Sequence, residues 1–387
     1  MAYIGCDPLF WVRREAAFAV GALAKVVPIE VVMLTLLPLF EALIRDTFWQ
    51  VRHSAVFALP GILTRIKPQH RRTLALNTLL PLSGDVALAV RSGVLEVLGE
   101  VIYAFHEDDK GAPPELVGLF VGREQGFEWQ QHENGGEPWL GEPSTAEATI
   151  PPSTLQSGND DGSPERSETA QPEQLGKVTS SSTVKTRPGD FLRDPARSII
   201  TSFNYPAVAL SLGPRRWDEV RGYYLTLTQG KNVHVRRTIA AGLGEMARIL
   251  GCELAERDLL DAWQDMVHDA EDGQTRLKAL GGVCLFVGAL NGPAREGILV
   301  GLVELWEQWL MGWRERQCLI LAMPTLAVLA EAQGEVVRTL MRKALVDKMA
   351  AVREAAIGTV GDSSRPRFHF LTQCYDYLPA YSCPSCI

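Results

Sequence analysis

One sequence form recurs at a fixed interval near the start of the chain, and it constrains the fold more than any other feature. An aspartate is followed by four residues, by Val-Arg and then by an apolar run with helical spacing, beginning at Asp7, Asp46 and Asp85. The aspartates are 39 residues apart in both intervals, and their arginines are Arg13, Arg52 and Arg91. A fixed period of this length is typical of helix pairs that bury their apolar faces by stacking on one another.

The arginine of this form returns in the second half of the chain. It stands at Arg236, Arg276, Arg316 and Arg353, with spacings of 40, 40 and 37 residues, and Asp347 restores the aspartate in the last unit. Seven units therefore carry the arginine. Eight residues past each arginine the side chain is small or proline: Gly21, Pro60, Gly99, Gly244, Cys284, Pro324 and Gly361. One small position in each second helix predicts a close helix approach or a bend.

Composition divides the chain into four parts. Residues 1–106 and 191–361 carry the helix pairs, whereas residues 362–387 show no helical period and form an irregular tail. Residues 107–190 are rich in Pro, Gly, Ser, Thr and Glu, and hold 16 acidic and 6 basic residues, a net charge of −10. Such a segment buries too little apolar surface to offset the entropy of ordering, so we predict that it is disordered. The predicted fold is all-α, a right-handed α-solenoid interrupted by a long disordered acidic insert. The first unit lacks its first helix and the period stops after Gly361, as in a piece of a longer array.

Charge and cysteine content exclude several classes of protein. The net charge of −8 argues against general affinity for nucleic acid or for an acidic membrane. Seven cysteines are scattered along the chain and form no disulfide framework, which favours a reducing compartment. No secretory signal is visible, and the most apolar run, residues 29–44, is too short to span a bilayer. These features predict a soluble cytoplasmic protein, with the nucleus as a second location.

Three stretches carry a resemblance to known proteins. Residues 205–213 read Tyr-Pro-Ala-Val-Ala-Leu-Ser-Leu-Gly, and Trp217 and the Val-Arg-Arg-Thr-Ile-Ala of residues 235–240 follow them. The other stretches are the repeat form at 46–60 and the turn Trp-Arg-Glu-Arg at 313–316. The repeated turns resemble the HEAT family of helical repeats. Within it, the stretches at 205–240 and 46–60 resemble the regulatory subunit 1 class of protein phosphatase 4, a relative of the type 2A phosphatase scaffold, and the turn at 313–316 resembles the tryptophan-arginine turns of that scaffold.

The resemblance implies a binding edge. In that family the turns inside the helix pairs line one ridge, on which the catalytic subunit docks. Carried over to this chain, the implied partner-binding residues are Phe10, Trp11, Phe48, Trp49, Trp313 and Arg314. Aromatic and arginine side chains are frequent binding hot spots, although the same aromatic rings could instead pack on the neighbouring repeat. We interpret the recurring aspartates and arginines as structural, the carboxylate capping the second helix and the guanidinium bonding a neighbouring turn.

The resemblance therefore predicts a regulatory or scaffold subunit that has no catalytic activity of its own, binds a serine/threonine phosphatase catalytic subunit and directs its choice of substrate. The alternative is a general HEAT-repeat adaptor in nuclear transport or vesicle-coat assembly. For this chain we predict no cofactor, no nucleic-acid partner and no membrane binding.

Catalytic and metal sites have weak sequence support. Deoxyhypusine hydroxylase is a HEAT-repeat enzyme that holds iron with repeated His-Glu pairs, but here such pairs occur only at 106–107 and 132–133 and do not follow the repeat. Cys383 and Cys386 have the spacing of half a zinc site, which Cys374 and His369 could complete, yet they lie in the irregular tail. We predict no metal site and no catalytic residue.

Overall fold

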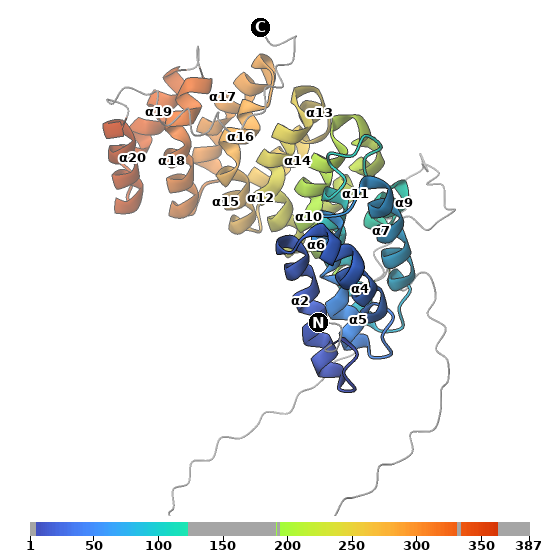
Figure 1. Ribbon diagram of the computed structural model, residues 1–387. Helices are drawn as coiled ribbons and strands as arrows, with labels where there is room; N and C mark the ends of the chain where they lie inside the picture. The colour runs from blue at the N-terminus through green and yellow to red at the C-terminus, as the bar shows by residue number, and fades with distance from the viewer. Residues whose placement is uncertain (1–4, 123–190, 192–193, 331–333, 363–387) are drawn as a thin grey trace, which may run out of the picture. The chain divides into compact units, whose positions relative to one another are not determined.

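A computed structural model of the chain describes residues 5–122, 191, 194–330 and 334–362 (Figure 1). Within these ranges the regular elements are helices, and no strand occurs. The predicted all-α class is therefore confirmed. None of the helices in these ranges is both long enough and apolar enough to cross a membrane.

The helices before residue 123 are α2 (Phe10–Val26), α3 (Ile29–Val31), the π-helical η1 (Val32–Leu36), α4 (Leu37–Leu43), α5 (Trp49–Val56), α6 (Leu59–Leu63), α7 (Pro68–Ser83), α8 (Leu88–Tyr103) and α9 (Pro114–Val121). Those after residue 193 are α10 (Arg197–Leu212), the short η3 (Pro214–Arg216), α11 (Asp218–Thr228), α12 (Val233–Leu250), α13 (Cys252–Asp258), α14 (Leu260–Val267), α15 (Gly273–Gly281), α16 (Val283–Gly288), α17 (Gly292–Gln308), α18 (Trp313–Leu329), α19 (Gly334–Leu345) and α20 (Ala350–Asp362).

These helices form pairs that stack in one series. The second helices of the pairs are α2, α5 with α6, α8, α10, α12, α15 with α16, α18 and α20, and each packs on the next in this order. First helices such as α4, α7, α11, α14 and α19 pack on the second helix of their own pair. This arrangement is the predicted α-solenoid, because each pair buries its apolar face against its neighbours.

Two helices are interrupted at a proline, where the sequence predicts a bend or a break. Pro38 lies in the first turn of α4, and the π-helical η1 precedes it. Pro60 lies in the first turn of α6, and α5 has already ended at Val56. A proline has no N–H to donate and its ring collides with the carbonyl four residues earlier, and at these two positions the helix is interrupted just before it, whereas α10 and α18 accommodate Pro206 and Pro324.

The boundary predicted at residue 107 is wrong, because residues 114–121 form α9. The side chains of Leu116, Val117 and Phe120 in this helix are at most 2% exposed. Proline, glycine and acidic neighbours lower the average hydropathy of the region, which hides one short apolar helix. Residues 123–190 of the predicted disordered insert and residues 363–387 of the predicted tail lie outside the described ranges.

Helix α9 also changes where the insert belongs. Arg197 at the start of α10 donates hydrogen bonds of 2.7 Å to the carbonyls of Leu119 and Phe120, near the end of α9. The ring centroid of Phe120 lies 5.1 Å from that of Tyr205 in α10. Helices α9 and α10 are therefore the two halves of one pair. Residues 123–190 join them inside the turn of that pair, rather than separating two repeats as the sequence suggested.

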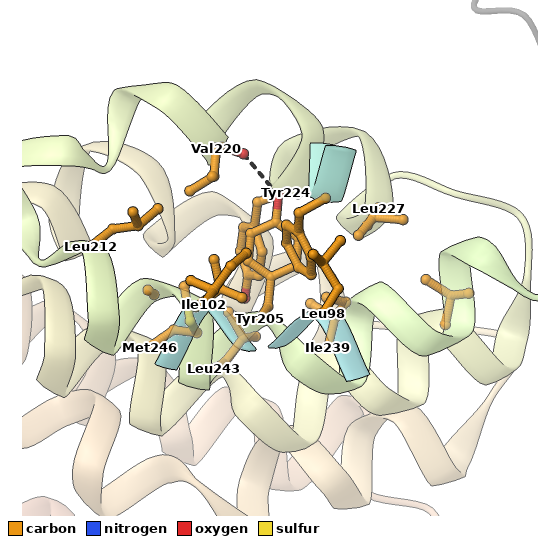
Figure 2. Close-up of a cluster of buried hydrophobic side chains, with 14 of the residues drawn as sticks. Leu98, Ile102, Tyr205, Leu212, Val220, Tyr224, Leu227, Ile239, Leu243 and Met246 are labelled. Atoms are coloured by element: carbon orange, nitrogen blue, oxygen red, sulfur yellow. Dashed lines mark hydrogen bonds between the residues drawn. The ribbon is translucent and has the colours of Figure 1, made fainter. Parts of the chain in front are cut away.

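A buried cluster joins the repeats on both sides of α10 (Figure 2). Tyr205 is fully buried, and its hydroxyl donates a hydrogen bond of 2.8 Å to the carbonyl of Val220 in α11. The ring centroids of Tyr205 and Tyr224 are 4.8 Å apart. Leu98 of α8 and Leu243 of α12 are also fully buried in this cluster. The two repeat segments therefore share one hydrophobic core.

The small positions of the second helices allow close backbone approach. A Cβ atom on Gly21 would lie 2.7 Å from the Cα atom of Ala58, and one on Gly244 would lie 2.6 Å from the carbonyl oxygen of Gly282. A Cβ atom on Gly99 would likewise lie 2.7 Å from the Asn204 side chain. In each case the neighbour belongs to the next second helix, or to the break between its two halves, as the sequence predicted for close approach.

Candidate functional site

The recurring aspartates organise the turn that precedes each second helix. A carboxylate oxygen of Asp7, Asp46, Asp85 and Asp347 accepts a hydrogen bond of 2.8–2.9 Å from the amide two residues further on. In the first three units that amide belongs to the N-cap residue, and no side chain caps the helix itself. The predicted helix cap is therefore wrong in detail, because the carboxylate closes the turn and the helix begins three residues after the aspartate.

Each arginine links its own turn to the next turn. Arg13 Nη1 donates to the carbonyl of Asp7 at 2.8 Å, and Arg13 Nε donates to the carboxylate of Asp46 at 2.6 Å. Arg52 repeats the arrangement, with 2.8 Å to the carbonyl of Asp46 and 2.7 Å to the carboxylate of Asp85. We call this series of contacts the Asp–Arg ladder. It fixes the position of each turn relative to the next one.

The ladder continues in the second half with one change of residue. Arg236 forms an ion pair with Asp269, whose carbonyl accepts a hydrogen bond from Arg276. Arg276 pairs with Glu315 at 2.9 Å, so a glutamate takes the place of the next aspartate. Because Asp269 and Glu315 do not keep the spacing of the first three aspartates, the sequence pattern did not reveal them.

The ladder ends among the described residues at the last pair. Arg316 donates to the carboxylate of Asp347 at 2.7 Å and to the carbonyl of Leu310 at 2.8 Å. Arg353 donates to the carbonyl of Asp347 at 2.6 Å. The eleven aspartates and arginines predicted as structural therefore all lie in or beside intra-pair turns.

The ladder changes at the pair that carries the insert. Arg91 donates to the carbonyl of Asp85 at 2.6 Å. The next turn carboxylate is that of Asp194, which accepts hydrogen bonds from Ser92 Oγ at 2.5 Å and from the amide of Ala196 at 2.9 Å. Asp194 is an unpredicted turn residue, since the insert places it 109 residues after Asp85.

Two of the ladder carboxylates, those of Asp46 and Asp347, are held in their charged form. Burial disfavours the charge on Asp46, but hydrogen bonds from Arg13 and from the Phe48 amide outweigh it and lower the pKa of the carboxyl below its ordinary value. The same balance, with Arg316 and the Met349 amide as donors, lowers the pKa of Asp347. An ionised carboxylate at these two turns is thus part of the folded structure.

These directions predict loss of stability in acid. A carboxyl whose folded-state pKa lies below its unfolded value of about 3.9 stabilises the fold above that pH, and its contribution is lost as pH falls through the folded-state pKa. We expect Asp46→Asn to lower the free energy of unfolding by about 1–3 kcal/mol at pH 7 and to make its decline between pH 7 and pH 3 shallower. Urea unfolding at several pH values measures both.

Glu15→Gln is the matched control for that substitution. Glu15 pairs with the adjacent Arg14, and both side chains are well exposed. Its replacement should cost less than about 1 kcal/mol. An equal loss in the two variants, or an unchanged pH dependence in Asp46→Asn, would contradict a ladder role for Asp46.

The predicted aromatic residues of the first two turns divide into two groups. Phe10 is half-buried and stacks on Phe48, with ring centroids 4.9 Å apart, and Arg13 lies over the Phe48 ring at 5.6 Å. Trp11 is 52% exposed and Trp49 is 43% exposed. Packing on the neighbouring repeat thus accounts for Phe10 and for part of Phe48, whereas the two tryptophans leave large apolar surfaces open to a partner.

Sequence reasoning missed the aliphatic residues that extend this surface. Leu9 in the first turn, and Val86 and Leu88 in the third, are 50–68% exposed. We define the N-terminal ridge as the exposed turn residues Leu9, Trp11, Phe48, Trp49, Val86 and Leu88. The register of the repeat could have identified the aliphatic members, because Leu88 stands three residues before its arginine, as Trp49 does.

A second apolar turn lies before α18. The guanidinium of exposed Arg314 lies 4.3 Å from the ring centroid of half-buried Trp313, a cation–π contact. Met311 beside them is 69% exposed. We define Met311, Trp313 and Arg314 as the C-terminal ridge. The intervening turns before α12 and α15 have the polar N-caps Asn232 and Asp272, so the two ridges are described separately.

The structure offers little for chemistry at these turns. No cluster of His, Cys, Asp and Glu that could hold a metal ion occurs among the residues it describes. His106 lies 3.5 Å from Glu107 and stacks on Tyr103, with ring centroids 4.4 Å apart. The other His-Glu pair, and the candidate zinc ligands of the tail, fall outside the described ranges.

Comparison with known proteins shows which families the repeats resemble. The model of the family described as protein phosphatase 4 regulatory subunit 1 middle domain matches residues 201–305, and that of the HEAT repeat matches residues 36–66. The chain is a HEAT-repeat protein that resembles protein phosphatase 4 regulatory subunit 1. The serine/threonine-protein phosphatase 4 regulatory subunit 1 of Homo sapiens is 35% identical over 71 residues, as are those of Mus musculus and Rattus norvegicus. This HEAT-repeat chain aligns over 18% of its own length and 8% of theirs.

A solved structure agrees on the fold of this HEAT-repeat chain. A crystal structure of importin beta matches 97% of the chain and 42% of its own length, with a TM-score of 0.55 and 14% sequence identity. At that identity the likeness concerns the helical solenoid alone.

Proposed function

We propose that this chain is a non-catalytic regulatory or scaffold subunit of a serine/threonine protein phosphatase of the type 4 or type 2A-like group. The match of residues 201–305 to the middle domain of protein phosphatase 4 regulatory subunit 1 carries the proposal. The exposed ridges support it, because Trp11, Trp49 and Arg314 are residue types that supply most of the binding energy in protein interfaces.

The proposed mechanism is docking of the catalytic subunit on the two ridges. The Asp–Arg ladder holds successive turns in fixed positions, so the apolar side chains need little further ordering when a partner binds. A catalytic subunit held there would keep its active site in a set orientation to proteins bound elsewhere on the solenoid. Substrate choice would then depend on which proteins this subunit brings close.

The test is capture of endogenous phosphatase catalytic subunit by the full chain, with bound proteins identified by mass spectrometry. We expect Trp11→Ala with Trp49→Ala, and separately Trp313→Ala with Arg314→Ala, to weaken that binding by about 30-fold or more, as expected for hot-spot residues. Thermal melts followed by circular dichroism should change little for the first pair, because both tryptophans are substantially exposed.

Leu34→Ala is the matched control, since Leu34 is 80% exposed but lies in η1, away from the turns. It should leave phosphatase capture unchanged. A melting temperature that falls together with binding would show that the tryptophans pack rather than bind. Recovery of transport cargo without any phosphatase would favour the adaptor function and reject the phosphatase proposal.

A further inference from the structure

Helix α10 is apolar on a face that no part of the described structure covers. Its buried side consists of Tyr205, Val208, Ala209 and Leu212. On the other side Phe203 is 76% exposed and Leu210 is 50% exposed. These two residues are seven apart, so they lie two helical turns apart on one side of α10. A large aromatic ring at such exposure, with a leucine aligned beside it, is typical of a binding surface.

The neighbouring helix α8 adds negative charge and a further ring to this face. Glu96, Glu100 and Tyr103 are exposed and recur at intervals of four and three residues, so they share one side of α8. The two helices approach closely there, because a Cβ atom on Gly99 would lie 2.7 Å from the side chain of Asn204, the residue after Phe203. The exposed faces of α8 and α10 are therefore adjacent.

The two glutamates are available to a ligand. Both side chains are exposed, and Glu96 lies close enough to His53 for its charge to act on that imidazole. We define the α8–α10 face as Glu96, Glu100, Tyr103, Phe203 and Leu210. It joins three apolar side chains to two exposed negative charges and lies along the helices, apart from the ridges at the turns.

Charge decides which kind of segment this face accepts. Residues 123–190 of the chain hold 12 acidic and 5 basic residues, a net charge of −7, so the two glutamates repel that insert. The face is both negatively charged and apolar. A complementary segment brings lysine or arginine to Glu96 and Glu100, and aliphatic or aromatic side chains to Phe203 and Leu210. An amphipathic helix with apolar residues at helical spacing and a basic flank presents these groups together.

We propose that the α8–α10 face docks a basic amphipathic helix of a partner protein. This interaction is separate from the proposed phosphatase binding, since it uses none of the ridge residues. A regulatory chain with both surfaces would hold two different proteins at once, one at the turns and one along the second helices.

The test uses a fluorescein-labelled synthetic peptide of leucine and lysine at amphipathic helical spacing, and a matched peptide with glutamate in place of lysine. Fluorescence anisotropy with the full chain measures the affinity for each. We expect Phe203→Ser with Leu210→Ser to weaken binding of the lysine peptide at least tenfold. Glu96→Lys with Glu100→Lys should weaken it similarly and should strengthen binding of the glutamate peptide at least tenfold.

Leu34→Ser and Val346→Ser are the controls, because both side chains are at least 80% exposed and lie outside the α8–α10 face. They should bind both peptides as the unmodified chain does, and circular dichroism should show all variants folded. Equal affinity of the unmodified chain and both face variants for the lysine peptide would overturn the proposal.

Two further measurements test for other occupants of the α8–α10 face. If a chain ending at Asp362 bound the lysine peptide at least tenfold more tightly than the full chain, the segment 363–387, which contains Arg365 and Arg367, would be the occupant. If sedimentation showed self-association that Phe203→Ser with Leu210→Ser abolished, the occupant would be a second copy. Either result would overturn docking of a partner helix.

Discussion

Gly244→Leu is expected to lower the free energy of unfolding by about 3 kcal/mol or more, although leucine ordinarily favours a helix over glycine. A Cβ atom at this position would lie 2.6 Å from the carbonyl oxygen of Gly282 and 3.1 Å from Cβ of Leu285. The first neighbour is backbone at the break between α15 and α16, and it cannot move aside without displacing a helix. Urea unfolding followed by circular dichroism measures the loss.

Gly301→Leu is the matched control for this substitution. Gly301 lies in the middle of α17, is exposed, and has no atom within 4 Å of the Cβ position. There the helical preference of leucine acts alone and should stabilise the protein by up to about 1 kcal/mol. The same chemical change is therefore expected to have opposite signs at the two sites. Destabilisation by both variants would show that helix packing at Gly244 is not the cause.

The 39-residue form and its arginines were enough to predict the class of fold and most of the second helices. Short-range sequence patterns were sufficient for this, because a turn aspartate, an arginine and a helical apolar run recur together from Asp7, Asp46 and Asp85. The contact from each arginine to the following turn joins residues that are 33 apart in the first units. The spacing indicated that these residues belong to one repeat, but only coordinates show which carboxylate each guanidinium meets.

The prediction failed where composition was averaged over a long window. Helix α9 is eight residues long and lies beside a segment rich in Pro, Gly and Glu. Its assignment to the same pair as α10 depends on Arg197 and Tyr205. These residues follow the insert and contact the end of α9 only in the folded chain. No local pattern in residues 107–122 carries that information, so the insert was assigned between pairs rather than inside one.

The candidate ridge was predictable in position but not in exposure. Phe10 and Trp11 are adjacent in the sequence and similar in chemistry, yet Phe10 stacks on Phe48 while Trp11 is 52% exposed. Which of two neighbouring aromatic rings faces the next repeat depends on the angle at which the turn enters α2. The aliphatic Val86 and Leu88 were missed for another reason, since aromatic content rather than register guided the choice.

Tyr205→Ala is expected to cost about 3–5 kcal/mol and to divide unfolding into two transitions. Tyr205 is fully buried in α10 and contacts rings from α9 and α11, with centroid distances of 5.1 Å to Phe120 and 4.8 Å to Tyr224. In a repeat protein each pair is stabilised only by its neighbours, so a weak central pair separates the repeats before it from those after it. Differential scanning calorimetry of the variant should resolve the two transitions.

Two further variants test whether the effect of Tyr205→Ala depends on the loss of the ring and on its place in the central pair. Tyr205→Phe keeps the ring and removes only the hydrogen bond to the Val220 carbonyl, so it should cost about 1 kcal/mol and leave a single transition. Phe40→Ala makes a comparable cavity in α4, close to the start of the array, where Phe40 is also fully buried. It should lower stability without uncoupling α8 from α12, because α10 still bridges them. A single transition in Tyr205→Ala would mean that contacts other than this ring couple the two repeat segments.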